Sequence, residues 1–176
     1  VVRTPRGTVD LAAVAGVLGE VGLPERAFRD QLVFEGEIRA VLLVENLGAW
    51  RDLAAPEGWL LAHVPGWDTA ATMLLLDRLT DVPVVHFGDL DPNGVRIHLH
   101  LRDRRADLKW FVPSFWREAI DSHARPAAWP PDLDLAEAPP LIGELASRGL
   151  WLEQEAITLD ARVAGALEEL VSERGR

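Results

Sequence analysis

Three short segments of this chain are apolar almost throughout, and they constrain its fold more than any other feature. They span residues 39–45, 59–64 and 82–87. A strand without polar alternation is typical of a parallel sheet whose two faces are both covered. A fourth strand is predicted over residues 108–112.

Helical segments separate and follow these strands. Their expected ranges are residues 10–21, 69–79, 114–122, 141–147 and 161–173. Asp10 opens the first of them, and Ser114 is expected to cap the third. Strands that alternate with helices predict an α/β protein, a Rossmann-like fold with a mainly parallel central sheet of about four strands.

One segment, residues 95–101, is compatible with two structures. Its apolar residues alternate with period two, which favours a strand. A helix would have to be apolar on two sides, but the Pro-Asn-Gly turn that precedes the segment favours a helix. Periodicity alone does not decide between them.

Composition limits the class of protein. The chain has 176 residues and no cysteine, which suits one domain and excludes disulfides and thiolate metal sites. No apolar run approaches the roughly 20 residues of a membrane helix, and nothing resembles a secretory signal, so we expect a cytoplasmic protein. Because the chain starts at Val1, we expect the C-terminal part of a longer protein. Residues 1–38 would then be a helical segment or linker packing on a domain over 39–176.

Two aspartates follow the third predicted strand directly. Asp89 and Asp91 lie in the sequence His-Phe-Gly-Asp-Leu-Asp-Pro-Asn-Gly over residues 86–94. Ligand sites in open α/β sheets lie beyond the carboxyl ends of the strands, and paired carboxylates there suit Mg²⁺. Glu45 closes the first strand, so one ion could contact Glu45, Asp89 and Asp91. The alternatives are a solvated Glu45 and an Asx-type turn at the aspartates.

The charge balance bears on nucleic-acid partners. The net charge is −10, which argues against tight DNA binding by this chain alone, since Lys and Arg drive phosphate binding. Arg96 and Arg102 follow the acidic motif, and Lys109 is the only lysine. Each could contact a DNA phosphate, although a solvated face or a snorkelling side chain is the more common role for such residues.

Two other motif families use a similar aspartate pair. An EF-hand loop needs a bidentate glutamate at its twelfth position, and this chain has His100 there. A haloacid-dehalogenase-like phosphatase would use Asp89 as nucleophile, but it also needs a downstream lysine and a further acidic pair. The phosphatase stays an alternative.

The ordered set of segments resembles a third family. Residues 41–46, 64–67, 86–97 and 152–155 are similar to the Toprim domain of topoisomerases, primases and related nucleases. More narrowly, they resemble the C-terminal domain of JetD, the nuclease subunit of Wadjet plasmid-defence systems, a relative of the topoisomerase VI A subunit. The resemblance covers residue 39 to the C-terminus.

This resemblance implies a metal-dependent DNA endonuclease within an SMC-like complex, and a homodimer by analogy. Glu45, Asp89 and Asp91 occupy the family's catalytic and metal-binding positions, with Glu155 a weaker candidate ligand for Mg²⁺, for which Mn²⁺ would substitute. Topoisomerase VI relatives cut DNA with a tyrosine, and this chain has none, which favours metal-assisted hydrolysis. A catalytically inactive Toprim interaction module is the remaining alternative.

Overall fold

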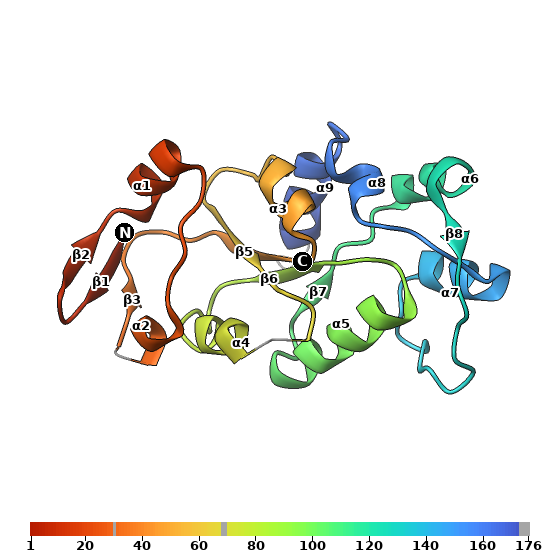
Figure 1. Ribbon diagram of the computed structural model, residues 1–176, viewed down its shortest axis with the longest axis horizontal. Coiled ribbons are helices and arrows are strands. Elements are labelled where there is room, and N and C mark those ends of the chain that lie inside the picture. The colour runs from red at the N-terminus through yellow and green to blue at the C-terminus, as the bar shows by residue number, and fades with distance from the viewer. Residues whose placement is uncertain (30, 68–69, 173–176) are drawn as a thin grey trace.

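The centre of the molecule is a four-stranded parallel sheet. A computed structural model describes residues 1–29, 31–67 and 70–172. The sheet has the order β5–β4–β6–β7, and all neighbouring strands pair in parallel (Figure 1). Its strands are β4 (Ala40–Val44), β5 (Trp59–His63), β6 (Val84–Phe87) and β7 (Lys109–Trp110). The predicted parallel α/β sheet is confirmed.

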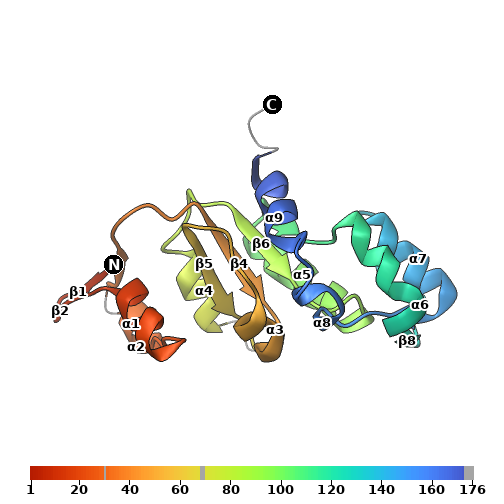
Figure 2. The ribbon, with the colours of Figure 1, turned by 90° about the horizontal axis from the view of Figure 1, so that it is seen from above.

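Helices cover both faces of this sheet, which explains its apolar strands (Figures 1 and 2). In β4, Leu42 and Val44 join one buried cluster while Val41 and Leu43 join another. The first cluster includes residues of α3 (Leu47–Asp52), α8 (Glu155–Thr158) and α9 (Val163–Ser172). The second includes residues of α4 (Ala70–Leu76) and α5 (Pro92–Arg104). Neither face of β4 therefore reaches water.

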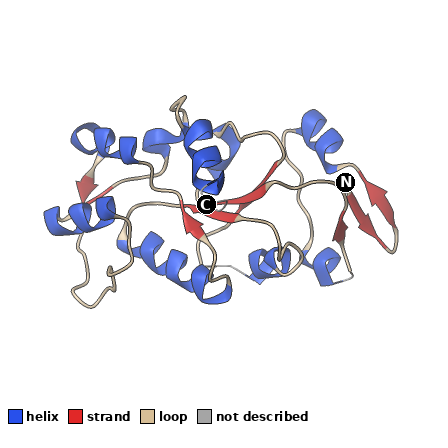
Figure 3. Ribbon diagram, turned by 180° about the vertical axis from the view of Figure 1, so that it is seen from behind, coloured by secondary structure: helices blue, strands red, loops and turns tan. Residues whose placement is uncertain are grey.

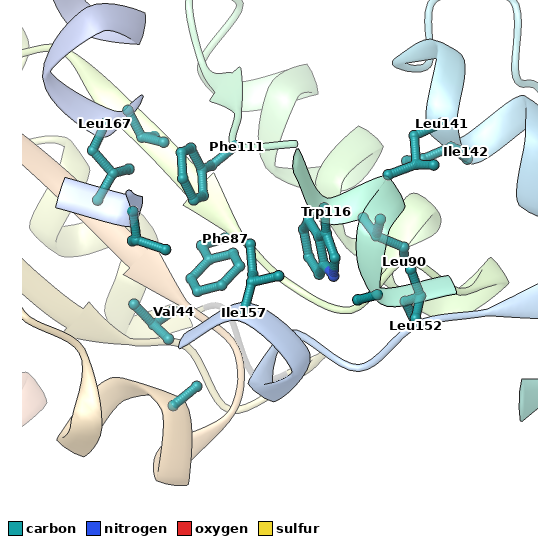
Figure 4. Close-up of a cluster of buried hydrophobic side chains, with 14 of the residues drawn as sticks. Val44, Phe87, Leu90, Phe111, Trp116, Leu141, Ile142, Leu152, Ile157 and Leu167 are labelled. Carbon is teal, nitrogen blue, oxygen red and sulfur yellow. The ribbon is translucent and has the colours of Figure 1, made fainter. Parts of the chain in front are cut away.

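Aromatic packing extends the first cluster beyond the sheet. Phe87 meets the edges of Phe111 and Trp116, with ring centroids 5.3 Å and 5.5 Å away (Figure 4). Leu141 and Ile142 of α7 (Pro140–Arg148) belong to the same cluster. The C-terminal elements and the end of β6 thus share one core.

The ambiguous segment over 95–101 is helical and lies within α5. Val95 packs into the first cluster, whereas Ile97 and Leu101 pack into the second. The helix is buried on two sides, and this produces the alternation that imitates a strand. Asp91 caps the helix and Pro92 occupies its first turn, where a proline costs no hydrogen bond.

The N-terminal residues contain a second sheet that the sequence pattern does not predict. It is antiparallel, with the order β2–β1–β3. Its strands are β1 (Val2–Thr4), β2 (Gly7–Val9) and β3 (Val33–Phe34), and the helices α1 (Leu11–Leu18) and α2 (Glu25–Arg29) lie between β2 and β3. Strands of two or three residues are too short to show an alternating pattern.

The opposite end of the molecule combines short helices with a two-stranded ribbon (Figure 3). Its elements are the 3-10 helix η1 (Ser114–Ala119), α6 (Ile120–His123), β8 (Arg125–Pro126), α7 and β9 (Leu150–Trp151). The predicted cap at Ser114 is wrong, because Pro113 occupies the capping position and makes no side-chain hydrogen bond there.

The remaining helix predictions are confirmed, three of them with shorter bounds and the one over 141–147 with longer bounds. The segments 10–21, 69–79, 141–147 and 161–173 correspond to α1, α4, α7 and α9, while residues 69 and 173 lie outside the described part of the chain. None of the helices described is long and apolar enough to span a bilayer.

Candidate active site

Glu45 lies at the carboxyl end of β4, directly beside the end of β6. The register pairs Val44 with Phe87, and the Glu45 N–H donates to the Phe87 carbonyl at 3.1 Å. Glu45 is therefore level with Gly88. A Cβ at Gly88 would overlap Glu45 Oε2 and come within 2.9 Å of the His86 ring, so only glycine leaves room for both side chains.

The two aspartates flank a leucine that is anchored in the core. Leu90 is fully buried and forms an antiparallel bridge with Leu152, its N–H donating to the Leu152 carbonyl at 2.8 Å. In extended backbone, alternate side chains share a face. Asp89 and Asp91 are therefore directed to the side opposite Leu90, away from the core. Asp89 and Asp91 therefore lie on the same side of the chain because Leu90, between them, is anchored in the core.

Backbone N–H groups hold both aspartates. Asp91 Oδ1 accepts from the Gly94 N–H at 2.6 Å as the cap of α5, and Asp89 Oδ1 accepts from the Gln154 N–H at 2.8 Å. The Asx-type alternative is thus partly correct, because Asp91 has a capping role. Each carboxylate still has a second oxygen that these bonds do not use.

Gln154 connects the two loops that carry the acidic residues. It is fully buried, its N–H binds Asp89, and its Oε1 accepts from the Asn46 N–H at 3.0 Å. Asn46 in turn caps α3 through its side chain. One residue therefore ties the Glu45–Asn46 turn to Asp89.

The three acidic side chains form a cluster of like charge. Burial, followed by the negative charges of Asp89 and Asp91, raises the pKa of Glu45 to about 7, against one opposing hydrogen bond from the Asp89 backbone. Burial is also the main cause that raises the pKa of Asp89 to about 6. Within the described residues, no Lys or Arg forms an ion pair with any of the three.

The cluster has the chemistry of a site for a hard cation. Its donors are carboxylate oxygens, and Glu45 Oε2 is buried without a hydrogen-bond partner. Among the residues that the structure describes, no three His, Asp or Glu side chains are yet close enough together to hold one ion. The residue types fit Mg²⁺, and binding it requires the carboxylates to move closer together.

The weaker candidates lie at different distances from this cluster. Glu155 begins α8, and its charge contributes to the raised pKa of Asp89, so it is near the site. Arg96 is exposed on α5, a little more than one turn beyond the cap. Arg102 lies ten residues beyond Pro92, roughly 15 Å along the helix, and pairs with Glu137 at 2.8 Å.

Lys109 is also away from the carboxyl edge. It pairs with Val85 of β6, two residues before the strand ends, and its Nζ donates to the Leu170 carbonyl. The structure therefore places Glu45, Asp89, Asp91 and Glu155 at the same edge of the sheet, near enough for their charges to interact. It does not bring Arg102 and Lys109 to them.

Comparison with known proteins identifies the family. The family described as "Wadjet protein JetD, C-terminal" matches residues 11–165. The chain belongs to this JetD C-terminal family. A comparison with curated proteins gives no match. Family membership makes the chain a Wadjet component, and the match includes α1 and α2 in addition to the central sheet.

The roles of two residues in this JetD domain could not be predicted from the sequence. Gln154 lies between two glutamates that attract attention as metal ligands, and nothing in the local pattern marks it as buried. His86 is part of the recognised motif, but only the structure places its Nε2 3.9 Å from Glu45 Oε2. Gly88, at a strand end two residues after His86 and directly before Asp89, is the one sequence signal of that close approach.

The raised pKa values predict how stability depends on pH without metal. Glu45 has a folded pKa of about 7 against 4.5 for the ordinary group, and Asp89 about 6 against 3.8. The folded state binds these protons more tightly than the unfolded state does. The contribution of the two groups to the free energy of unfolding is therefore complete below about pH 4, falls as pH rises, and is lost above about pH 7. Each pKa unit is roughly 1.4 kcal/mol, so Glu45 alone contributes on the order of 3 kcal/mol.

Urea unfolding in EDTA at a series of pH values measures this effect. Glu45→Gln should flatten the decline, because an amide cannot be deprotonated. Asp160, whose pKa is held at about 2 by Arg162, titrates below this window and does not interfere. Stability that rises between pH 4 and 7 would contradict the description of a repulsive carboxylate cluster.

Proposed function

We propose that this chain carries a Toprim-type, Mg²⁺-dependent DNA endonuclease site formed by Glu45, Asp89 and Asp91. It would be the nuclease component of a Wadjet plasmid-defence complex with SMC-like subunits. The observation that carries the proposal is that three carboxylates follow β4 and β6 at the same edge of the sheet, near enough for the charges of Asp89 and Asp91 to act on Glu45, with no basic partner in the described chain. Membership of the JetD C-terminal family supports it.

The acidic residues of the chain would have different roles in this site. Asp89 and Asp91 would hold the cation, since backbone N–H groups already orient one oxygen of each. Glu45 would complete the ligand set or take a proton from the attacking water. Bound Mg²⁺ would stabilise negative charge on the phosphate and lower the pKa of that water. Glu155 would support this set from the start of α8.

Metal-assisted hydrolysis is the reaction that this chain can supply. It has no tyrosine with which to form a covalent link to DNA. Its net charge of −10 makes the chain a poor DNA ligand by itself, so other subunits would supply basic surface. Arg96 is the candidate phosphate contact that lies closest along the chain to the acidic motif.

Cleavage of supercoiled plasmid tests the proposal. The protein is incubated with its Wadjet subunits and with Mg²⁺, Mn²⁺ or EDTA, and nicked and linear products are measured. We expect cleavage with either metal and none with EDTA. Cleavage that persists in EDTA would contradict the proposal, and hydrolysis of a small phosphate monoester without DNA cleavage would indicate the phosphatase alternative.

A further inference from the structure

Behind Glu45 lies a buried group of three aromatic rings from three elements. His86 of β6, His98 of α5 and Trp110 of β7 contribute one ring each. The His98 ring stacks on Trp110 with centroids 4.4 Å apart, and its Nδ1 edge faces the Nδ1 edge of His86, with those two centroids 5.5 Å apart. His86 is fully buried and His98 is 5% exposed. Burial keeps both imidazoles neutral, with pKa values of about 3 and about 4.

Two polar atoms without a hydrogen-bond partner lie near each other at the edge of this group of rings. His86 Nε2 and Glu45 Oε2 are both buried without a hydrogen-bond partner in the described structure, and they are 3.9 Å apart. A buried polar group that lacks a partner is costly, so such a pair needs an explanation. The space between them exists because residue 88 is glycine.

The hydrogen bond at His86 Nδ1 decides whether His86 Nε2 carries a proton toward Glu45. His86 Nδ1 is 3.3 Å from His98 Nδ1, so one of the two must donate and the other accept. If His86 donated, its Nε2 would present a bare lone pair to the Glu45 carboxylate. If His98 donates, the single proton of His86 is on Nε2 and points at Glu45 Oε2.

We infer that His86 is a positioning residue for Glu45, donating Nε2–H to Glu45 Oε2, with His98 selecting that tautomer through its own Nδ1–H. The 3.9 Å separation closes to hydrogen-bond length through a small rotation of the Glu45 side chain. The second oxygen of Glu45 then stays available for metal or water. The inference rests on the proposed function only for the role of Glu45, because the hydrogen-bond chain itself can be observed without catalysis.

Nitrogen-15 NMR of the metal-free chain tests the tautomers directly. At a pH well above the pKa of Glu45, we expect His86 protonated on Nε2 and bare on Nδ1, and His98 protonated on Nδ1. The exposed His123 ring, whose Nδ1 is 2.7 Å from Ser122 Oγ, provides a surface histidine for comparison. A His86 proton on Nδ1 would overturn the inference, whether or not the chain cleaves DNA.

A pair of substitutions separates positioning from packing. His86→Phe keeps a buried aromatic ring but removes the donor, whereas His86→Gln keeps an N–H near the position of Nε2 but loses the ring. Positioning predicts that the more stable variant is the less active one, with cleavage by His86→Phe reduced roughly 10–100-fold and His86→Gln close to the unchanged chain. If the more stable of the two variants is instead the more active one, the positioning role of His86 is overturned.

His98→Leu provides an independent route if neither His86 variant folds. It leaves His86 in place and removes the partner of its Nδ1. We expect a mixture of His86 tautomers in the NMR spectrum and a partial loss of cleavage. An unchanged His86 tautomer together with unchanged cleavage would overturn the part assigned to His98.

Discussion

Replacement of Asp89 by asparagine is expected to reduce DNA cleavage by about 10²–10³-fold while the fold is kept. The amide has the same shape, and its oxygen can still accept the Gln154 N–H. It lacks the charge that would hold the cation and stabilise the transition state, and losses of that size follow removal of one electrostatic contact at an active site. Plasmid cleavage at saturating Mg²⁺ measures the effect.

Stability should move in the opposite direction from activity in this variant. Burial disfavours the charged form of Asp89, so Asp89→Asn should raise the metal-free free energy of unfolding at pH 8. Asp103→Asn is the matched control, because Asp103 is exposed on α5 and should leave cleavage unchanged. Full cleavage by Asp89→Asn, with the control behaving as expected, would exclude Asp89 from the site.

Replacement of Gly94 by alanine is expected to destabilise the fold by about 1–3 kcal/mol or more, as overpacking does. Alanine in a helix is ordinarily better than glycine by about 1 kcal/mol, so helix propensity predicts the opposite sign. The reason is local: a Cβ at Gly94 would overlap the Asp89 carbonyl oxygen and would lie 3.5 Å from Asp91 Oδ1. The first turn of α5 would have to move away from the loop that carries both aspartates.

Gly143 provides the control for this substitution. It is an exposed glycine within α7, and a Cβ there meets no atom within 4 Å. Gly143→Ala should therefore stabilise the protein by up to about 1 kcal/mol, consistent with helix propensity. Thermal unfolding of both variants measures the contrast. A stabilised Gly94→Ala variant would show that helix and loop do not approach each other so closely.

The sheet and the edge that carries the acidic residues could be predicted because their causes are local. Residues 40–44 are apolar on both faces and residues 84–87 are apolar except for His86, and this indicates a parallel sheet with helices on each side. The carboxyl ends of neighbouring parallel strands share an edge, so Glu45 and Asp89 follow from the same pattern. Which strands are neighbours was not predictable from the pattern, and the pairing of β4 with β6 depends on the whole fold.

Other parts depend on contacts between segments far apart in the chain. The alternation over residues 95–101 arises because α5 is buried on two sides, and no sequence period distinguishes that from a strand. Gln154 is recognisable as a link only once its Oε1 meets the Asn46 N–H, 108 residues away in sequence. The tautomer of His86 depends in the same way on His98 and on a glycine that keeps a space open.

A crystal structure of the chain grown with Mn²⁺ tests the central claim most directly. Anomalous scattering locates the ion without prior assumptions about its ligands. We predict an Mn²⁺ peak about 2.1 Å from oxygens of Asp89 and Asp91, with the Glu45 carboxylate turned to the same ion or to a water bound to it. A crystal at saturating Mn²⁺ with no ion among these three side chains would contradict the proposed metal-dependent site.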